Sequence, residues 1–203
     1  MHHDVLEWTM SEQTIVRKSA AQGSQSTFDD PTKEKAIRDK TMHFNAHVNV
    51  EQLPEGKHLK KATIFSNVPN GGTWELISDE GTAVGGRGSA PSPLMYFAAG
   101  AALCMMSHVE MLAQQRGMVV TARLEQKFAF STSMNLKGSQ VELLNGRADK
   151  LSMNLILESD SPPEEIDLLV QDCKKACMAF NATCNATPSE LSFSVNGSPL
   201  TAV

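Results

Sequence analysis

The chain has 203 residues and a formal net charge of -5. This length predicts one domain with room for an appendage, and 41% hydrophobic and 20% charged residues are typical of a globular protein. The acidic balance disfavours nucleic acid and anionic membranes as partners, because neither attracts a negatively charged protein. The polar N-terminus lacks the features of a signal peptide, and no apolar run reaches the roughly 20 residues that span a bilayer. We therefore expect a cytoplasmic protein whose four cysteines stay reduced.

Residues 1–40 are rich in Ser, Gln, Thr, Asp and Lys and show no sustained apolar period. A segment of this composition cannot bury enough apolar surface to offset the entropy lost on ordering. We interpret it as a mobile or loosely docked N-terminal arm, and residues 41–203 as the folded domain.

Three strands are predicted before the first helix. Apolar and polar residues alternate over residues 42–50, which is the period of a half-buried strand, and His43 and His47 fall on its polar, solvated face. Further strands are expected at 60–68 and 73–78, because a Pro-Asn-Gly-Gly turn separates these two runs.

A Gly- and Pro-rich loop at 79–92 leads into a long predicted helix over residues 93–116. Pro93 suits the first helical position, and Gly117 suits the position just beyond the end. The residues that recur at helical spacing along it are Leu94, Phe97, Ala98, Ala101, Cys104, Met105, His108, Met111 and Leu112. Small residues at the centre of this helix predict a closely packed neighbour.

Two strands, a second helix and a final strand follow. Alternating apolar residues predict strands near 120–130 and 151–157. Ser161 can cap the second helix, whose apolar stripe includes Cys177, and residues 191–195 form the last strand. The resulting order, βββ-α-ββ-α-β, indicates an α+β fold.

The cysteines allow two interpretations. Cys104 and Cys177 each lie on the apolar face of a predicted helix, where a free cysteine is commonly a small core residue. The same placement allows two thiols to face each other across packed helices and to form a disulfide in a redox cycle. Cys173, Cys177 and Cys184 match no tight zinc-binding pattern, so we expect no metal and no cofactor.

His108 follows Cys104 by one helical turn and also allows two interpretations. A histidine on an apolar helix face is commonly a core residue with its polar atoms satisfied. It can also be a catalytic group beside the sulfur, because its charge changes near neutral pH.

The run from Gly85 to Cys104 resembles the hallmark stretch of the OsmC/Ohr superfamily. It reads Gly-Gly-Arg-Gly-Ser-Ala-Pro-Ser-Pro-Leu-Met-Tyr-Phe-Ala-Ala-Gly-Ala-Ala-Leu-Cys. In that family a Gly-rich loop and a proline start a long central helix, and small residues precede the reactive cysteine. Ala-Cys-Met at 176–178 is similar to the segment around the family's second cysteine. The resemblance covers about residues 42–197.

This resemblance implies a two-layer α+β fold in an intertwined homodimer with long central helices and two active sites at the interface. It also implies that the thiolate of Cys104 reduces an organic hydroperoxide to an alcohol and becomes a sulfenic acid. Cys177 then forms a disulfide with Cys104, and a dithiol reductant reopens that bond.

The chain departs from the family pattern at the group that activates the thiol. Family peroxidases use an arginine held by a glutamate that directly follows the helix-starting proline, and this chain has Leu94 there. Cys104 lies far inside the helix, beyond the reach of the helix dipole, so its thiolate requires a nearby cation. Arg87 and the lysines within 57–61 are the available cations, although a solvated loop charge is the alternative reading of Arg87.

Two functions remain open. The leading hypothesis is a cysteine-dependent reductase of organic hydroperoxides, favoured by the retained pair of cysteines. The alternative is a non-enzymatic OsmC-like protein that binds a small hydrophobic or thiol-bearing ligand at the dimer interface, favoured by the missing glutamate. The residues expected to line the substrate or ligand pocket are Leu94, Met95, Met105 and His108.

Overall fold

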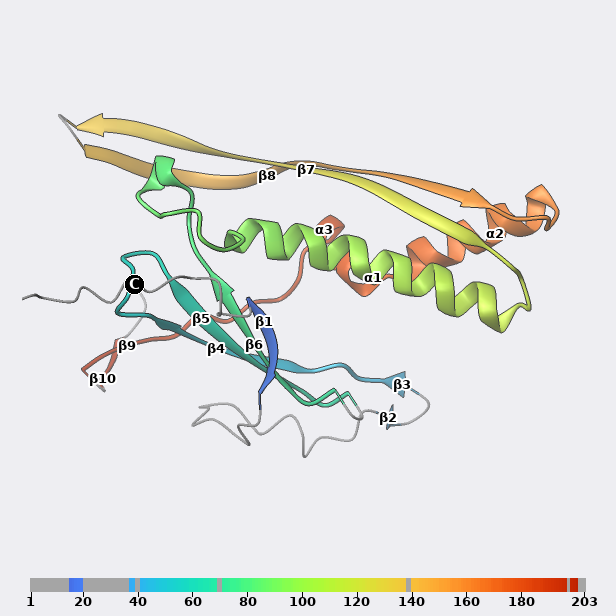
Figure 1. Cartoon of the computed structure of the whole chain (residues 1–203), viewed down its shortest axis with the longest axis horizontal. Helices are drawn as coiled ribbons and strands as arrows, with labels where there is room; N and C mark the ends of the chain where they lie inside the picture. The colour runs from blue at the N-terminus through green and yellow to red at the C-terminus, as the bar shows by residue number, and fades with distance from the viewer. Residues whose placement is uncertain are drawn as a thin grey trace, which may run out of the picture. The chain divides into compact units, whose positions relative to one another are not determined.

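The computed structural model describes residues 15–19, 37–38, 41–68, 71–137, 140–196 and 198–200. In this part of the chain, three α-helices and ten strands are present (Figure 1). The predicted α+β class is therefore confirmed.

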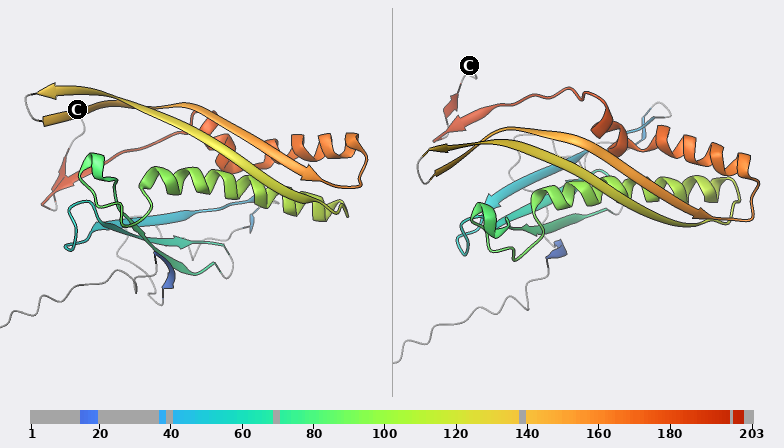
Figure 2. Two further views of the ribbon diagram at one scale, coloured as in Figure 1. Left: turned by 45° about the horizontal axis from the view of Figure 1, so that its top comes forward. Right: turned by 90° about the horizontal axis from the view of Figure 1, so that it is seen from above.

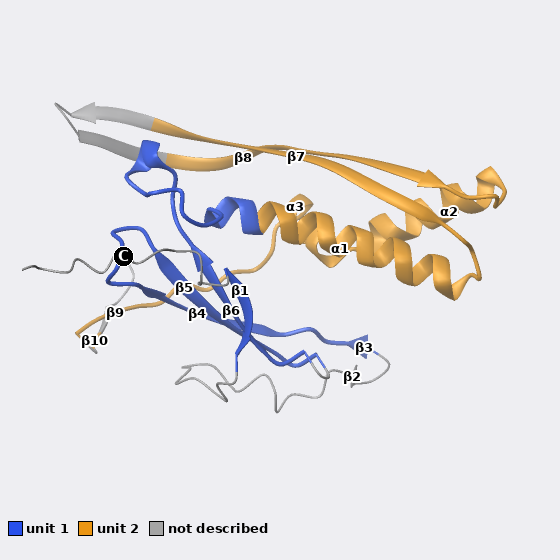
Figure 3. Cartoon of the chain, in the orientation of Figure 1, with its two compact units in different colours: residues 1–96 blue, residues 97–203 orange. Residues whose placement is uncertain are grey.

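The chain divides into two compact units, residues 1–96 and 97–203 (Figure 3). Within the expected N-terminal arm, Val16–Ser19 forms strand β1, while most of the arm lies outside the described residues. The proposed boundary between an arm and a domain that starts at residue 41 stays a prediction.

An antiparallel sheet with the strand order β1-β6-β5-β4 organises the first unit. β4 spans Ala46–Gln52, β5 spans Lys60–Ser66 and β6 spans Thr73–Ser78. β6 coincides with the third predicted strand, and β5 begins where predicted and ends two residues earlier. The first predicted strand is interrupted, because β3 (Thr41–Met42) pairs with β2 (Ile37–Arg38) and β4 starts only at Ala46.

The two faces of β4 are exposed differently from the prediction. Val48 and Val50, on the apolar face, are 51% and 61% exposed, whereas His47 on the other face and His43, which precedes β4, are half-buried. The alternation of the two faces was predicted correctly, but the apolar face is the one exposed to solvent in a single chain. Exposed apolar faces of this kind commonly mark a contact surface.

The second unit packs helices against a long hairpin. β7 (Thr121–Lys137) and β8 (Gln140–Glu158) pair antiparallel along their length. Helices α1 (Pro93–Gln115) and α2 (Pro163–Ala176) run along one face of this hairpin (Figure 2). A short hairpin of β9 (Phe193–Val195) and β10 (Ser198–Leu200) follows, and β9 overlaps the last predicted strand.

The core of the second unit lies where α1 and α2 meet the hairpin. α1 contributes Met105, Val109 and Ala113 at intervals of four residues, and α2 contributes Leu169 and Cys173 at the same interval. The hairpin residues packed against them alternate along the strands: Val120, Ala122, Leu124, Met153, Leu155 and Leu157. Full burial of a side chain such as Val, Leu or Met stabilises the fold by roughly 1.5–3 kcal/mol. The helix pair is therefore held firmly; α1 carries Cys104, and Cys177 directly follows α2.

α1 ends as the sequence predicts. Gly117 has a φ of +66°, and its N–H donates to the carbonyl of Gln114 at 3.1 Å. The N–H of Met118 donates to the carbonyl of Ala113 at 2.9 Å. These two bonds form a Schellman motif, which requires a left-handed residue at the position of Gly117.

By length and composition alone, α1 is also long and apolar enough to cross a membrane. It is the one helix of this kind in the described part of the chain. An apolar run of this length was not expected from the sequence. Met105 and Val109 nevertheless place its buried stripe in the core of the second unit, and a stripe of this kind is typical of a core helix. The expected absence of a membrane partner and the expected cytoplasmic location both stay predictions.

Candidate active site

The second predicted helix is broken at Cys177. α2 ends at Ala176, and α3 (Met178–Cys184) starts one residue after the break, where Cys177 has φ -69° and ψ 102°. At the other end, the predicted cap Ser161 is not used, because Pro162 occupies the N-cap position without a side-chain hydrogen bond. The prediction of one continuous helix with Cys177 in its interior was therefore wrong.

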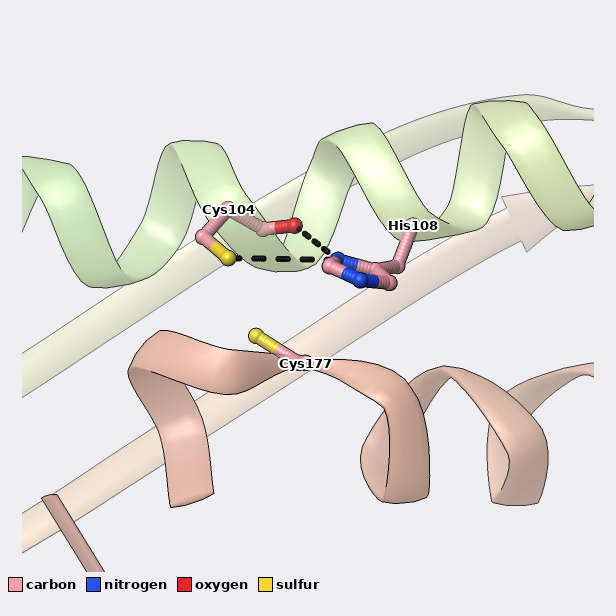
Figure 4. Close-up of side chains that lie close together, drawn as sticks. All are labelled: Cys104, His108 and Cys177. Atoms are coloured by element: carbon pink, nitrogen blue, oxygen red, sulfur yellow. Dashed lines mark hydrogen bonds between the residues drawn. The ribbon is translucent and has the colours of Figure 1, made fainter. Parts of the chain in front are cut away.

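The side chain of Cys177 compensates for this break. Its Sγ atom accepts a hydrogen bond from the N–H of Phe180 at 3.4 Å and so caps α3. Its own N–H still bonds to the carbonyl of Cys173 at 2.9 Å, which closes the last turn of α2. The break leaves Cys177 fully buried between the two helices, and its sulfur points toward α1 (Figure 4).

Cys104 and His108 lie one turn apart on the face of α1 that meets Cys177 (Figure 4). Nδ1 of His108 lies 2.7 Å from the carbonyl oxygen of Cys104 and 3.9 Å from its Sγ atom. A carbonyl only accepts hydrogen bonds, so this contact places a proton on Nδ1. His108 is buried and Cys104 is partly exposed, so Cys104 is the more accessible residue of the pair.

The two cysteines and the histidine form one cluster. The Sγ atoms of Cys104 and Cys177 and a ring nitrogen of His108 all lie within 4.8 Å of one another. Both thiols are free. The structure thus brings together three of the residues that the sequence singled out, from two separate helical segments.

Burial raises the pKa of the Cys177 thiol, and the nearby sulfur of Cys104 acts in the same direction. The N–H of Phe180 opposes this shift, because it stabilises the thiolate. Cys177 therefore remains a neutral thiol at neutral pH.

The other two cysteines lie apart from this cluster. Cys173 is fully buried one turn before Cys177 and belongs to the core. Cys184 is exposed at the end of α3. Neither belongs to the group that Cys104, His108 and Cys177 form.

The candidate cations lie in the first unit. Arg87 and Lys57 line one cavity of about 320 Å³ together with His58. Lys60 and Lys61 are paired with carboxylates instead, with Nζ–Oε1 distances of 3.6 and 2.6 Å to Glu80 and Glu51 respectively. Because Arg87 and Cys104 belong to different units, the activating role expected for Arg87 stays a prediction.

Asp79 fixes the Gly-rich loop and was missed by the sequence analysis. Its carboxylate is 2% exposed and accepts bonds from the N–H groups of Glu80, Arg87 and Ser89 and from the hydroxyl of Ser89, at 2.7–3.1 Å. These donors lower the pKa of Asp79 to about 2, with the Ser89 hydroxyl as the largest contributor. An aspartate that begins a Gly-rich loop is the sequence signal for such a turn.

The four residues predicted to line the pocket differ in how far they are buried. Met105 lies in the core and His108 lies beside Cys104, whereas Leu94 and Met95 are 52% and 63% exposed near the start of α1. A pocket that contains all four stays a prediction.

Comparisons with known proteins identify a family. The sequence model of the OsmC family, described as OsmC-like protein, matches residues 86–192, which is more than half of the chain. This match includes Cys104, His108 and Cys177. No curated protein sequence matches the chain.

Several solved structures are similar to the chain. An OsmC-like hydroperoxide resistance protein from Jannaschia sp. CCS1 is 23% identical with a TM-score of 0.48, and the match covers 78% of this chain and 97% of that one. An OsmC-like protein from Mycoplasma pneumoniae is 17% identical with a TM-score of 0.41, over 71% and 87% of the chains. An organic hydroperoxide resistance protein from Elizabethkingia anophelis is 17% identical with a TM-score of 0.42, over 72% and 91%. Since all three TM-scores are below 0.5, the family assignment rests on the sequence match.

Proposed function

Because the chain belongs to the family of OsmC-like proteins, we propose that it is a thiol peroxidase that reduces organic hydroperoxides with Cys104 and Cys177. The observation that carries this proposal is the approach of the two sulfur atoms to within 4.8 Å. A disulfide needs the sulfurs about 2.05 Å apart, so a side-chain rotation or a small movement at the break beside Cys177 has to close the gap.

The two thiols have different roles in this reaction. The thiolate of Cys104 attacks one oxygen of the peroxide, the O–O bond breaks, and the alkoxide leaves with a proton as an alcohol. Cys104 is then a sulfenic acid, and Cys177 attacks its sulfur. The hydroxyl of the sulfenic acid and the proton of Cys177 leave together as water, and a disulfide remains. A dithiol reductant restores both thiols by exchange.

The assignment of roles follows from accessibility. Cys104 is partly exposed and meets the peroxide first, whereas the fully buried Cys177 reacts only with a group already in the site. The raised pKa of Cys177 also keeps it protonated until it reacts, and this proton is the one that leaves with the hydroxyl.

His108 is the group in the second unit that is placed to assist Cys104. Its protonated ring would stabilise the thiolate across the 3.9 Å from Nδ1 to Sγ, and it would supply a proton to the leaving alkoxide. In this proposal His108 activates the thiol, a role that an arginine held by a glutamate has in the family peroxidases. Leu94 occupies the glutamate position and is largely exposed.

We further propose that the protein acts as a homodimer. Both units expose large apolar side chains in a single chain, among them Val48 and Val50 on β4 and Met95, Phe97 and Leu103 on α1. Covering such surfaces with a second copy removes apolar area from water, which is the main driving force of association. Sedimentation at micromolar concentration should give a dimer, and a well-folded monomer would contradict this part of the proposal.

The test of the peroxidase proposal is stopped-flow measurement of cumene hydroperoxide consumption by the reduced protein. Cys104→Ser should abolish consumption, because a serine hydroxyl is a far weaker nucleophile than a thiolate at neutral pH. Cys184→Ser, which alters an exposed cysteine outside the cluster, should leave the rate unchanged. Equal rates in wild type and Cys104→Ser would refute the proposal.

The second candidate function is binding of a small hydrophobic or thiol-bearing ligand without catalysis. The exposure of Leu94 and Met95 favours it, because these side chains offer an apolar surface where the family peroxidases have a glutamate. An inert Cys104 in the stopped-flow test, together with a dimer in sedimentation, would select this alternative.

A further inference from the structure

Cys104, His108 and Cys177 also have the composition of a metal site. We propose that the reduced protein binds one Zn²⁺ ion per chain through the two sulfurs and a ring nitrogen of His108 (Figure 4). Thiolate sulfur and imidazole nitrogen are the ligand types that zinc takes most often in proteins. This inference goes beyond the peroxidase function and does not depend on it.

The distances within the cluster suit an ion. Zn–S bonds of about 2.3 Å and Zn–N bonds of about 2.0 Å place tetrahedral ligands about 3.5–3.8 Å apart. The ligand atoms here lie within 4.8 Å of one another, and Nδ1 of His108 lies 3.9 Å from Sγ of Cys104. A contraction of at most about 1.3 Å therefore closes the set around zinc. A disulfide requires a larger approach of the two sulfurs, to about 2.05 Å.

The packing of the second unit keeps two of the ligand side chains in place before the ion binds. Cys177 is fully buried and His108 is 8% exposed, so neither side chain has to be ordered when the ion binds. Cys104 is partly exposed, and its side of the cluster gives the ion a route from solvent. Preorganised ligands strengthen binding because little conformational entropy is lost.

The present bonding of the cluster leaves capacity for an ion. The sulfur of Cys177 accepts a hydrogen bond from the N–H of Phe180 at 3.4 Å, and a thiol sulfur is a weak acceptor. Coordination replaces the thiol protons, and the charge of the ion then stabilises both thiolates.

The ring of His108 is oriented by the backbone. Its Nδ1–H donates to the carbonyl of Cys104, which leaves Nε2 with a free lone pair. A metal-bound histidine commonly donates its other N–H to a carbonyl in this manner, because that bond fixes the ring and its tautomer. Ligation through Nδ1, which lies 3.9 Å from the sulfur of Cys104, would instead replace the carbonyl bond.

Three protein ligands leave a fourth position on a tetrahedral ion. Zinc sites of two cysteines and one histidine keep that position for water or an exchangeable ligand. The partly exposed side of Cys104 is where such a ligand would enter. A bound ion would also hold both sulfurs that the peroxidase reaction needs, so the zinc form would not react with hydroperoxide.

The experiment is a titration of the metal-free, fully reduced chain with Zn²⁺, followed by calorimetry and by metal analysis after dialysis. One ion per chain is expected, and Co²⁺ should give the intense absorption of a thiolate–cobalt bond. Cys104→Ser and His108→Ala should each bind more weakly by at least about a hundredfold, since losing a ligand exceeds the 10–100-fold effect of losing a supporting group. Cys184→Ser is the matched control and should bind like the wild type.

Zinc that fails to bind the reduced wild type, or that binds Cys104→Ser equally well, would overturn the proposal. Cys104→Ser is the deciding variant because this residue is only partly buried, whereas Cys177→Ser alters a fully buried position. Circular dichroism of each variant checks that it is folded. An inactive peroxidase that still binds one zinc ion through these residues would refute the proposed reaction and support the metal site.

Discussion

Asp79 in the first unit and the Cys104–His108–Cys177 cluster in the second are two polar centres that differ in how fully their atoms are bonded. The Asp79 carboxylate accepts four hydrogen bonds of 2.7–3.1 Å. The two sulfurs of the cluster have contacts of 3.4 and 3.9 Å, and a thiol sulfur is a weak donor and a weak acceptor. A satisfied centre stabilises one conformation, whereas a weakly bonded one retains its capacity for a proton, an oxidant or an ion. We therefore assign a structural role to the first centre and a reactive role to the second.

The largest expected effect tests the structural centre. Asp79→Ala removes the acceptor for three N–H groups and one hydroxyl in the loop before α1. Leaving such donors unsatisfied should lower the free energy of unfolding by about 3 kcal/mol. Chemical denaturation measures this loss, and Asp160→Ala, at an exposed aspartate, is the control.

The pH dependence of Asp79→Asn sharpens the same test. The folded-state pKa of Asp79 is lowered to about 2, so its contribution is present in full above the ordinary value of about 3.9. It is lost as the pH falls through about 2. The stability difference between wild type and variant should be constant from pH 7 to about 5 and shrink below about pH 4. A difference that already shrinks near pH 6 would contradict this account of the carboxylate.

The next effect tests the reactive centre. His108→Ala removes the ring beside Cys104 and should slow oxidation of Cys104 by hydroperoxide roughly a hundredfold, the lower end of the range for loss of a proton-transfer group. Stopped-flow fluorescence or peroxide consumption measures the rate. His58→Ala, which changes a histidine of the first unit, serves as the control. An unchanged rate in His108→Ala would make this histidine a core residue.

Gly117→Ala tests the C-terminal end of α1, the helix on which Cys104 and His108 lie. Gly117 has a φ of +66°, and an added Cβ would meet no atom within 4 Å. The substitution should therefore lower stability by about 1–2 kcal/mol through backbone strain alone. Thermal unfolding measures this loss, and the rate of Cys104 oxidation should not change. A large fall in that rate would show that the end of α1 affects the site.

The smallest effect concerns the titration of Cys177. Burial raises its pKa, so alkylation of Cys177 in a variant without the other three cysteines should have a midpoint above about 8.5, the ordinary value. The rate of alkylation against pH, followed by mass spectrometry, gives this midpoint. A midpoint below the ordinary value would mean that a cation or the start of α3 outweighs burial.

Much of the fold could be predicted because its signals are local. Pro93 and Gly117 bound α1, and period-two alternation located most strands of both units. The spacing of Cys104 and His108 by one turn also placed them together before any tertiary contact was known.

The break at Cys177 could not be predicted by the same means. The apolar stripe continues through it, no glycine or proline marks it, and the cap of α3 is a cysteine sulfur rather than one of the usual cap residues. The zinc hypothesis was missed for a related reason. Sequence spacing offered Cys173, Cys177 and Cys184, which match no tight zinc-binding pattern, whereas the structure groups Cys177 with residues of a distant helix. Ligand sets of this kind depend on tertiary packing.

The most direct test of the central claim is peptide mapping after the reduced protein has reacted with one equivalent of cumene hydroperoxide. The account predicts a dominant Cys104–Cys177 disulfide, because these sulfurs belong to one cluster while Cys173 and Cys184 lie outside it. Wild type without zinc should form this bond, and Cys184→Ser should form it equally well. A dominant linkage between any other pair, or an unmodified Cys104, would contradict the account.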